Sequence, residues 1–104
     1  MSDLTNRVAL VTGASVGIGR AIALRLAEAG AFVGVHFNTG KAEAEETLPV
    51  IREAGGDGML LQADLANAEQ AMGLVNQLVT QTEQLDILVN NAGALLQRVK
   101  IEDC

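Results

Sequence analysis

The sequence predicts an α/β fold, in which a doubly wound parallel sheet carries helices on both faces. Three observations support this. Short apolar runs alternate with segments of helical spacing, the runs lack the polar alternation of half-exposed strands, and glycines stand at the junctions. Right-handed crossovers leave few topologies open, and a four-stranded sheet in the order 3-2-1-4 is the natural arrangement.

Four strands are predicted, at residues 7–12, 31–37, 59–62 and 86–90. Each is apolar and at most seven residues long, which is too short for a helix of ordinary length. The last predicted strand, 86–90, would leave an open apolar edge, and such edges invite association. We therefore expect a single domain over 1–104 that self-associates, belongs to a longer protein or is marginally stable.

The first helix is expected to follow the first strand and to end at Gly30, with an apolar face made of Ile18, Ala21, Ile22, Leu26 and Ala29. The second covers 41–54, and Pro49 within it predicts a kink at the surface or a restart of the helix. The third is expected to begin at Asn67, with Gln70 in an arrangement like a capping box.

Charge and composition exclude several classes of function. The formal net charge is −6 and the seven basic residues are scattered, which argues against a nucleic-acid partner. No apolar run approaches a membrane span, and no signal-peptide pattern is present, so we expect no membrane association and a cytoplasmic location. The single cysteine, Cys104, offers neither a disulfide nor a metal site.

A glycine-rich segment, Thr12-Gly13-Ala14-Ser15-Val16-Gly17-Ile18-Gly19, joins the first strand to the first helix. Gly13 suits the turn, Gly17 removes a side chain where backbone would approach a pyrophosphate, and Gly19 permits close helix–strand packing. The N–H groups at the helix start then attract phosphate. The alternative is a tight turn without a ligand. The segment lacks the lysine of a P-loop.

Two further segments are predicted to face the same crevice. Asn90-Asn91-Ala92-Gly93 ends the fourth strand, which neighbours the first strand in a 3-2-1-4 sheet. Asp64 follows the third strand. Ligands of such sheets bind beyond the carboxyl ends of the strands, where the strand order reverses. Each segment alone also fits an ordinary turn or a solvated loop acid.

Together, the Thr-Gly-x-x-x-Gly-x-Gly segment at 12–19, the Asp-Leu pair at 64–65 and Asn-Asn-Ala-Gly at 90–93 resemble the short-chain dehydrogenase/reductase family in order and spacing. The resemblance reaches to Gly93 and implies a Rossmann-like dinucleotide-binding fold. It also implies hydride transfer between a nicotinamide and an alcohol or carbonyl.

The resemblance implies a role for each matching residue. Backbone near Ser15, Gly17 and Ile18 would hold the adenosine ribose and the pyrophosphate. Asp64 would bind the adenine amino group, with Leu65 against the ring. The inner ribose of the cofactor would contact Asn90, Ala92 and Gly93. Thr12 and Asn90 would also tie the two central strands together.

The region after the second strand favours NADP over NAD as the cofactor. NAD-selective sites place an acid about 20 residues beyond the glycine-rich turn, and no acid occurs here between Glu28 and Glu43. His36, Asn38 and Lys41 are candidate donors to a 2′-phosphate. A satisfied strand-end histidine is the alternative for His36, and a solvated helix residue is the alternative for Lys41.

The family's general acid/base is a tyrosine in Tyr-x-x-x-Lys, helped by a serine and an asparagine, and this chain contains no tyrosine. We therefore expect cofactor binding without catalysis in the 104-residue chain, because proton transfer needs a group within reach of the reacting oxygen. Alternatives are a stand-alone nucleotide-binding module and an inactive remnant without a ligand.

Overall fold

A computed structural model describes residues 4–14 and 17–91 of the chain. Its four strands are β1 (Val8–Val11), β2 (Phe32–Phe37), β3 (Asp57–Gln62) and β4 (Ile87–Val89). All pairings are parallel and the strand order is β3-β2-β1-β4, which confirms the predicted 3-2-1-4 arrangement. The first and fourth strands are one residue shorter at each end than predicted.

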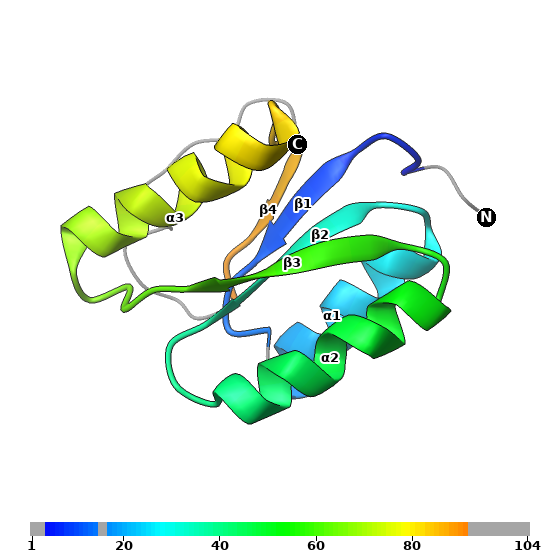
Figure 1. Ribbon diagram of the computed structural model, residues 1–104, viewed down its shortest axis with the longest axis horizontal. Coiled ribbons are helices and arrows are strands. Elements are labelled where there is room, and N and C mark those ends of the chain that lie inside the picture. The colour runs from blue at the N-terminus through cyan, green and yellow to red at the C-terminus, as the bar shows by residue number, and fades with distance from the viewer. Residues whose placement is uncertain (1–3, 15–16, 92–104) are drawn as a thin grey trace.

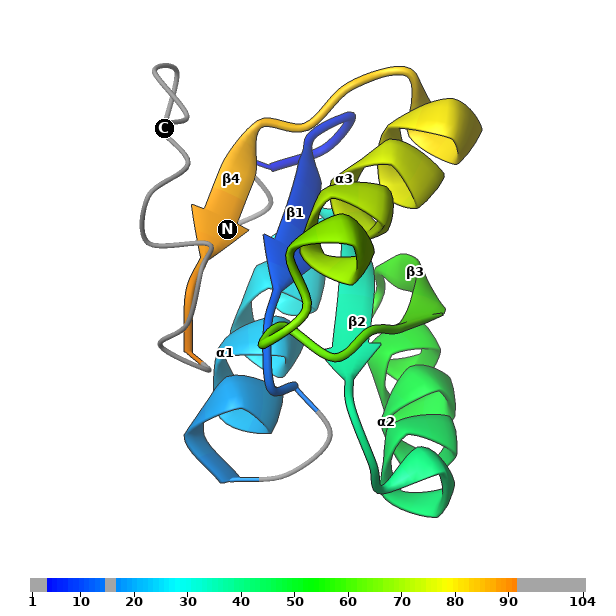
Figure 2. The ribbon, with the colours of Figure 1, turned by 90° about the vertical axis from the view of Figure 1, so that its left-hand side faces the viewer.

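Three helices connect the strands: α1 (Gly17–Glu28), α2 (Lys41–Glu53) and α3 (Ala68–Thr82). Helices α1 and α2 lie on one face of the sheet and α3 lies on the other (Figures 1 and 2). The chain therefore crosses to the opposite side of β1 between β3 and β4, and the strand order reverses there. Among the described helices, none is long and apolar enough to cross a membrane.

Strand β1 is the centre of the molecule, and all four of its residues are buried. Two apolar clusters flank the sheet. The cluster on the α3 face contains Leu10, Leu61, Leu65, Leu74 and Leu78 among its buried members. The cluster on the other face is built of smaller residues, among them Val11, Ala14, Ala23, Ala27, Val33, Val35 and Ile51.

Strand β3 begins two residues earlier than predicted, because Asp57 and Gly58 pair with Phe32 and Val33 of β2. A Cβ added at Gly58 would overlap the carbonyl oxygen of Val33. This glycine therefore permits a close approach of two strands. It follows the helix-ending Gly55-Gly56 pair closely, which is why the sequence suggested a longer turn.

The apolar face predicted for α1 is partly wrong. Its buried line is Gly19, Ala23 and Ala27, whereas Ile18 is 72% exposed. Small residues bring this helix close to its neighbours: a Cβ at Gly56 would lie 2.8 Å from the Cα of Ala27. A helix that packs this tightly buries the face that carries its smallest side chains, and its larger apolar side chains lie at the sides of that face.

The second helix is continuous from Lys41 to Glu53, which excludes a restart at the exposed Pro49. At the start of α3, the Asn67 side chain accepts a hydrogen bond from the N–H of Gln70 (3.1 Å), which confirms the predicted cap. The Gln70 side chain departs from a capping box, because its Oε1 accepts from the N–H of Asp64 (2.8 Å).

Candidate functional site

The glycine-rich turn lies between the end of β1 and the start of α1. Gly13 has φ +62° and Gly17 has φ +64°, a left-handed conformation that glycine adopts without strain. Outside its chain neighbours and its own helix backbone, no atom of the described residues lies within 4 Å of a Cβ placed at Gly17, so the space above it is open in this part of the chain. The first turn of α1, Gly17–Arg20, contains no acidic side chain that would oppose an anion at the helix start.

Gly19 is needed for the turn to sit against the helix. A Cβ there would overlap the carbonyl oxygen of Gly13 and would lie 2.7 Å from Nδ2 of Asn91. The same Nδ2 donates a hydrogen bond to the Gly13 carbonyl (3.1 Å). Close packing at Gly19 is present, but it brings the helix against the turn at Gly13 and against Asn91, whereas the sequence predicted packing against the strand.

The ends of β1 and β4 are joined by side chains as well as by backbone. The Thr12 N–H donates to the carbonyl of Val89 (3.0 Å). The Thr12 hydroxyl donates to Oδ1 of Asn90 (3.3 Å). The predicted tie between the two central strands is therefore confirmed. Asn91, to which the sequence assigned no role, lies at the same junction, and its partner Gly13 is 78 residues away along the chain.

His36 was predicted as a candidate donor to the cofactor, and the structure contradicts this. The residue is buried, with 2% of its surface exposed. Its Nδ1 accepts from the Gly13 N–H (2.9 Å), and its Nε2 lies 2.9 Å from the carbonyl oxygen of Ala63. Burial lowers the pKa of His36, and the smaller opposing effect is the Ala63 hydrogen bond. Both ring nitrogens are occupied, so the satisfied strand-end histidine is the correct interpretation.

The loop after β3 presents Asp64 to solvent. Its Oδ1 accepts the N–H of Ala66 (3.0 Å), while its own N–H is held by Gln70. Leu65 points elsewhere: it is 5% exposed and belongs to the core cluster with Leu61 and Leu74. This burial leaves little surface for an adenine ring, and the contact of Leu65 with the ring stays a prediction.

A hollow of about 500 Å³ lies at the carboxyl ends of β2 and β3. Its lining includes Asn38, Lys41 and Gln62. The Gln62 Nε2 donates to the Asn38 carbonyl (3.1 Å), which holds the two strand ends together. Thus the structure brings the turn, the Asp64 loop, Asn38 and Asn90 to one edge of the sheet. Three predicted residues, Ser15, Ala92 and Gly93, lie outside the described part of the chain.

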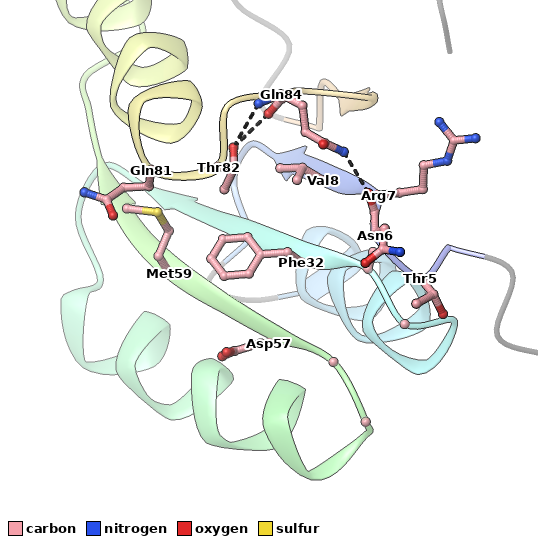
Figure 3. A pocket seen from close by; sticks show the side chains of 14 residues that line it. Thr5, Asn6, Arg7, Val8, Phe32, Asp57, Met59, Gln81, Thr82 and Gln84 are labelled. Carbon is pink, nitrogen blue, oxygen red and sulfur yellow. Dashed lines mark hydrogen bonds between the residues drawn. The ribbon is translucent and has the colours of Figure 1, made fainter.

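A larger hollow, of about 870 Å³, lies at the opposite edge of the sheet (Figure 3). Phe32 and Met59 form part of its floor, and polar side chains surround them. These polar groups bond to their own neighbours, as when Gln84 Nε2 donates to the Asn6 carbonyl (2.8 Å). We place the functional site at the other edge, because parallel sheets bind ligands at the carboxyl ends of their strands.

Comparison with known proteins assigns the family. The family model described as short chain dehydrogenase matches residues 7–104. The chain belongs to the short-chain dehydrogenase/reductase family. The short-chain dehydrogenase/reductase homolog YusS of Bacillus subtilis is 37% identical over 101 residues, and the match covers 97% of this chain and 92% of YusS.

Two solved structures of the family share the fold. A dehydrogenase of Burkholderia cenocepacia with bound NADP is 33% identical with a TM-score of 0.80, over 86% of this chain and 35% of the other. The NADH-dependent reductase A1-R′, responsible for alginate metabolism, is 37% identical with a TM-score of 0.84, over 96% and 43%. The chain spans 38% to 43% of the length of the longer curated relatives that it matches.

Proposed function

We propose that this chain binds the dinucleotide cofactor of a short-chain dehydrogenase/reductase, with the glycine-rich turn as the phosphate site. The open space above Gly17 supports the proposal most directly, since a left-handed glycine with no described side chain over it leaves room for a pyrophosphate. The N–H groups at the start of α1, free of nearby acid, suit its charge. These residues fit a phosphate-bearing cofactor.

The other residues at this edge have parts in the same proposal. Asp64 would bind the adenine amino group, and Asn90, Ala92 and Gly93 would hold the inner ribose. When bound, the nicotinamide would supply hydride to a carbonyl or accept it from an alcohol. We propose that these 104 residues orient the cofactor and do not transfer hydride by themselves, because they contain no tyrosine to act as the family's general acid/base.

NADP is the proposed cofactor, with NAD as the alternative. Two observations support this preference: the absence of an acid between Glu28 and Glu43, and the position of Asn38 and Lys41 in the hollow beside the strand ends. An acid there would repel a 2′-phosphate.

The Lys41→Met variant should weaken NADPH binding and leave NADH binding unchanged. Equal affinities of the unmodified chain for NADPH and NADH would contradict the preference.

The decisive experiment is a fluorescence titration of the chain with NADPH and NADH, using a matched pair of variants. Gly17→Asn places a side chain in the open space, and asparagine tolerates the left-handed conformation better than most residues. Gly55→Asn is the control, because Gly55 also has a positive φ (+106°) and open surroundings but lies at the opposite edge. We expect at least a tenfold loss of affinity for Gly17→Asn alone, with unchanged circular dichroism.

Two results would contradict the proposal. One is equal affinity in the Gly17 and Gly55 variants, which would place the ligand elsewhere. The other is a failure of both cofactors to bind at millimolar concentration, which would leave an inactive remnant as the explanation.

A stand-alone nucleotide-binding module is a second candidate function. It is favoured by YusS, a curated relative of which this chain covers 92%. The intact mass of the protein from its natural source distinguishes the two candidates. A mass more than twice that of the 10.8 kDa chain supports the oxidoreductase, and a mass near 10.8 kDa supports the module.

A further inference from the structure

His36 connects the two loops to which the proposed function assigns the cofactor's pyrophosphate and adenine. One ring nitrogen contacts Gly13, 23 residues before it, and the other contacts Ala63, 27 residues after it. Backbone bonds reinforce both junctions: the Ala14 N–H donates to the His36 carbonyl (2.9 Å), and the Ala63 N–H donates to the Phe37 carbonyl (3.1 Å). The imidazole therefore spans the distance between the two loops.

Only one form of the imidazole satisfies both contacts. The Gly13 N–H is a donor, so Nδ1 must be an unprotonated acceptor. The Ala63 carbonyl accepts only, so Nε2 must carry the proton. The other neutral tautomer and the imidazolium both place an N–H at Nδ1 against the N–H of Gly13. Because His36 is buried, water cannot compensate for that conflict.

We infer that His36 is a positioning residue for cofactor binding: in its neutral Nε2–H form it fixes the glycine-rich turn relative to the Asp64 loop, and protonation releases that turn. The inference rests on the proposed function. His36 acts through hydrogen bonds to the backbone of the two loops and does not contact the cofactor, since the side chain is buried and both ring nitrogens are already occupied.

The surroundings of the ring are almost free of charge. Strand β1, the turn residues 12–14 and the facing half of β3 carry no ionisable side chain. On the α3 side the charged groups are Asp64, which follows the bonded Ala63, and Glu69 in the first turn of α3, and both are exposed. Two carboxylates would favour the imidazolium, yet burial dominates and the pKa of His36 is lowered.

This charge balance sets the expected pH dependence. The unfolded chain binds the proton at a higher pH than the folded chain does. The contribution of His36 to the free energy of unfolding is therefore fully present above about pH 6.5 and decreases as the pH drops below that value. The cofactor affinity of the folded chain should fall at a lower pH than this, near the lowered pKa of His36, because the proton then competes with the arrangement that the cofactor needs.

The first test is ¹⁵N NMR of the chain without cofactor, in which His36 is the single histidine and gives the only imidazole signals. At pH 7.5 we expect Nε2 protonated and Nδ1 unprotonated. A spectrum of the Nδ1–H tautomer, or of two exchanging tautomers, would overturn the inference. Since no ligand is present, this result is independent of whether the proposed cofactor site is correct.

The second test compares three variants. His36→Leu removes both contacts, His36→Asn keeps an acceptor near Gly13, and His36→Gln keeps a donor within reach of Ala63. We expect His36→Leu to bind NADPH about tenfold more weakly, equivalent to about 1.4 kcal/mol, and His36→Asn to recover part of that loss. Equal affinity of His36→Leu and the unmodified chain would overturn the inference.

A pH series covers the case in which His36→Leu does not fold. NADH is the probe, because it lacks the 2′-phosphate that itself titrates near pH 6. The unmodified chain should lose NADH affinity with a one-proton slope on acidification while circular dichroism still reports a folded chain, and His36→Asn should show a flat profile. A flat profile for the unmodified chain, or the same slope in both proteins, would refute the proposed positioning role of His36.

Discussion

Adding a single methyl group at Gly19 should disrupt the turn on which the proposed site depends. The Cβ of Gly19→Ala would overlap the Gly13 carbonyl oxygen and lie 2.8 Å from the Gly13 carbonyl carbon. Backbone atoms cannot rotate away, so the turn and α1 must separate. Overpacking costs about 1–3 kcal/mol, and loss of the Asn91–Gly13 hydrogen bond adds about 1 kcal/mol. Alanine's better helix propensity offsets up to about 1 kcal/mol.

With that offset taken in full, the net expectation is a loss of about 1–3 kcal/mol in the free energy of unfolding, measured by urea denaturation. At about 4 °C per kcal/mol, the melting temperature should fall by roughly 4–12 °C. Gly73→Ala is the matched control, because Gly73 lies inside α3 and a Cβ there meets nothing within 4 Å. That variant should gain about 0.5–1 kcal/mol. If Gly19→Ala proves as stable as Gly73→Ala, the close-approach argument for this site is wrong.

Three further predictions concern stability. Pro49→Ala should raise the free energy of unfolding by about 1–3 kcal/mol in urea, since it restores an N–H inside a continuous helix; an unchanged midpoint would contradict this. Asn67→Ala should lower it by about 1 kcal/mol through loss of the cap on Gln70, and Asn67→Ser should restore most of the loss. The pKa of Asp86 is lowered chiefly because its carboxylate accepts the Val8 N–H (2.8 Å). The stability that this bond contributes should be fully present above about pH 4 and lost at lower pH. The Asp86→Asn variant should therefore lose less stability on acidification than the unmodified chain does. The same loss in both proteins would refute the assignment.

Several features followed from local sequence because their causes are local. The strand order, the helix stop at Gly30 and the Asn67 cap depend on apolar spacing, a positive φ and a side chain three residues from its partner. Gly13 was correctly predicted for the turn because few other residues adopt its conformation. The family resemblance rested on such short motifs, and the match of the family model over residues 7–104 confirmed it.

Other predictions depended on contacts between residues that are far apart in the sequence. Ile18 was expected on the buried face of α1, but the helix meets the sheet along its smallest residues. Leu65 was assigned to the adenine ring, and the structure places its side chain in the core cluster. Spacing shows which residues share a face of a helix, but it does not show how closely that face approaches its neighbour.

By itself, the sequence determined the element order, the parallel sheet, the glycine-rich turn and the family, because periodicity and backbone preference are encoded within a few residues. Only the tertiary structure decided the role of His36. A buried imidazole and a ligand-binding one look alike in sequence. The difference lies in Gly13 and Ala63, which reach the ring only after three strands have paired in register.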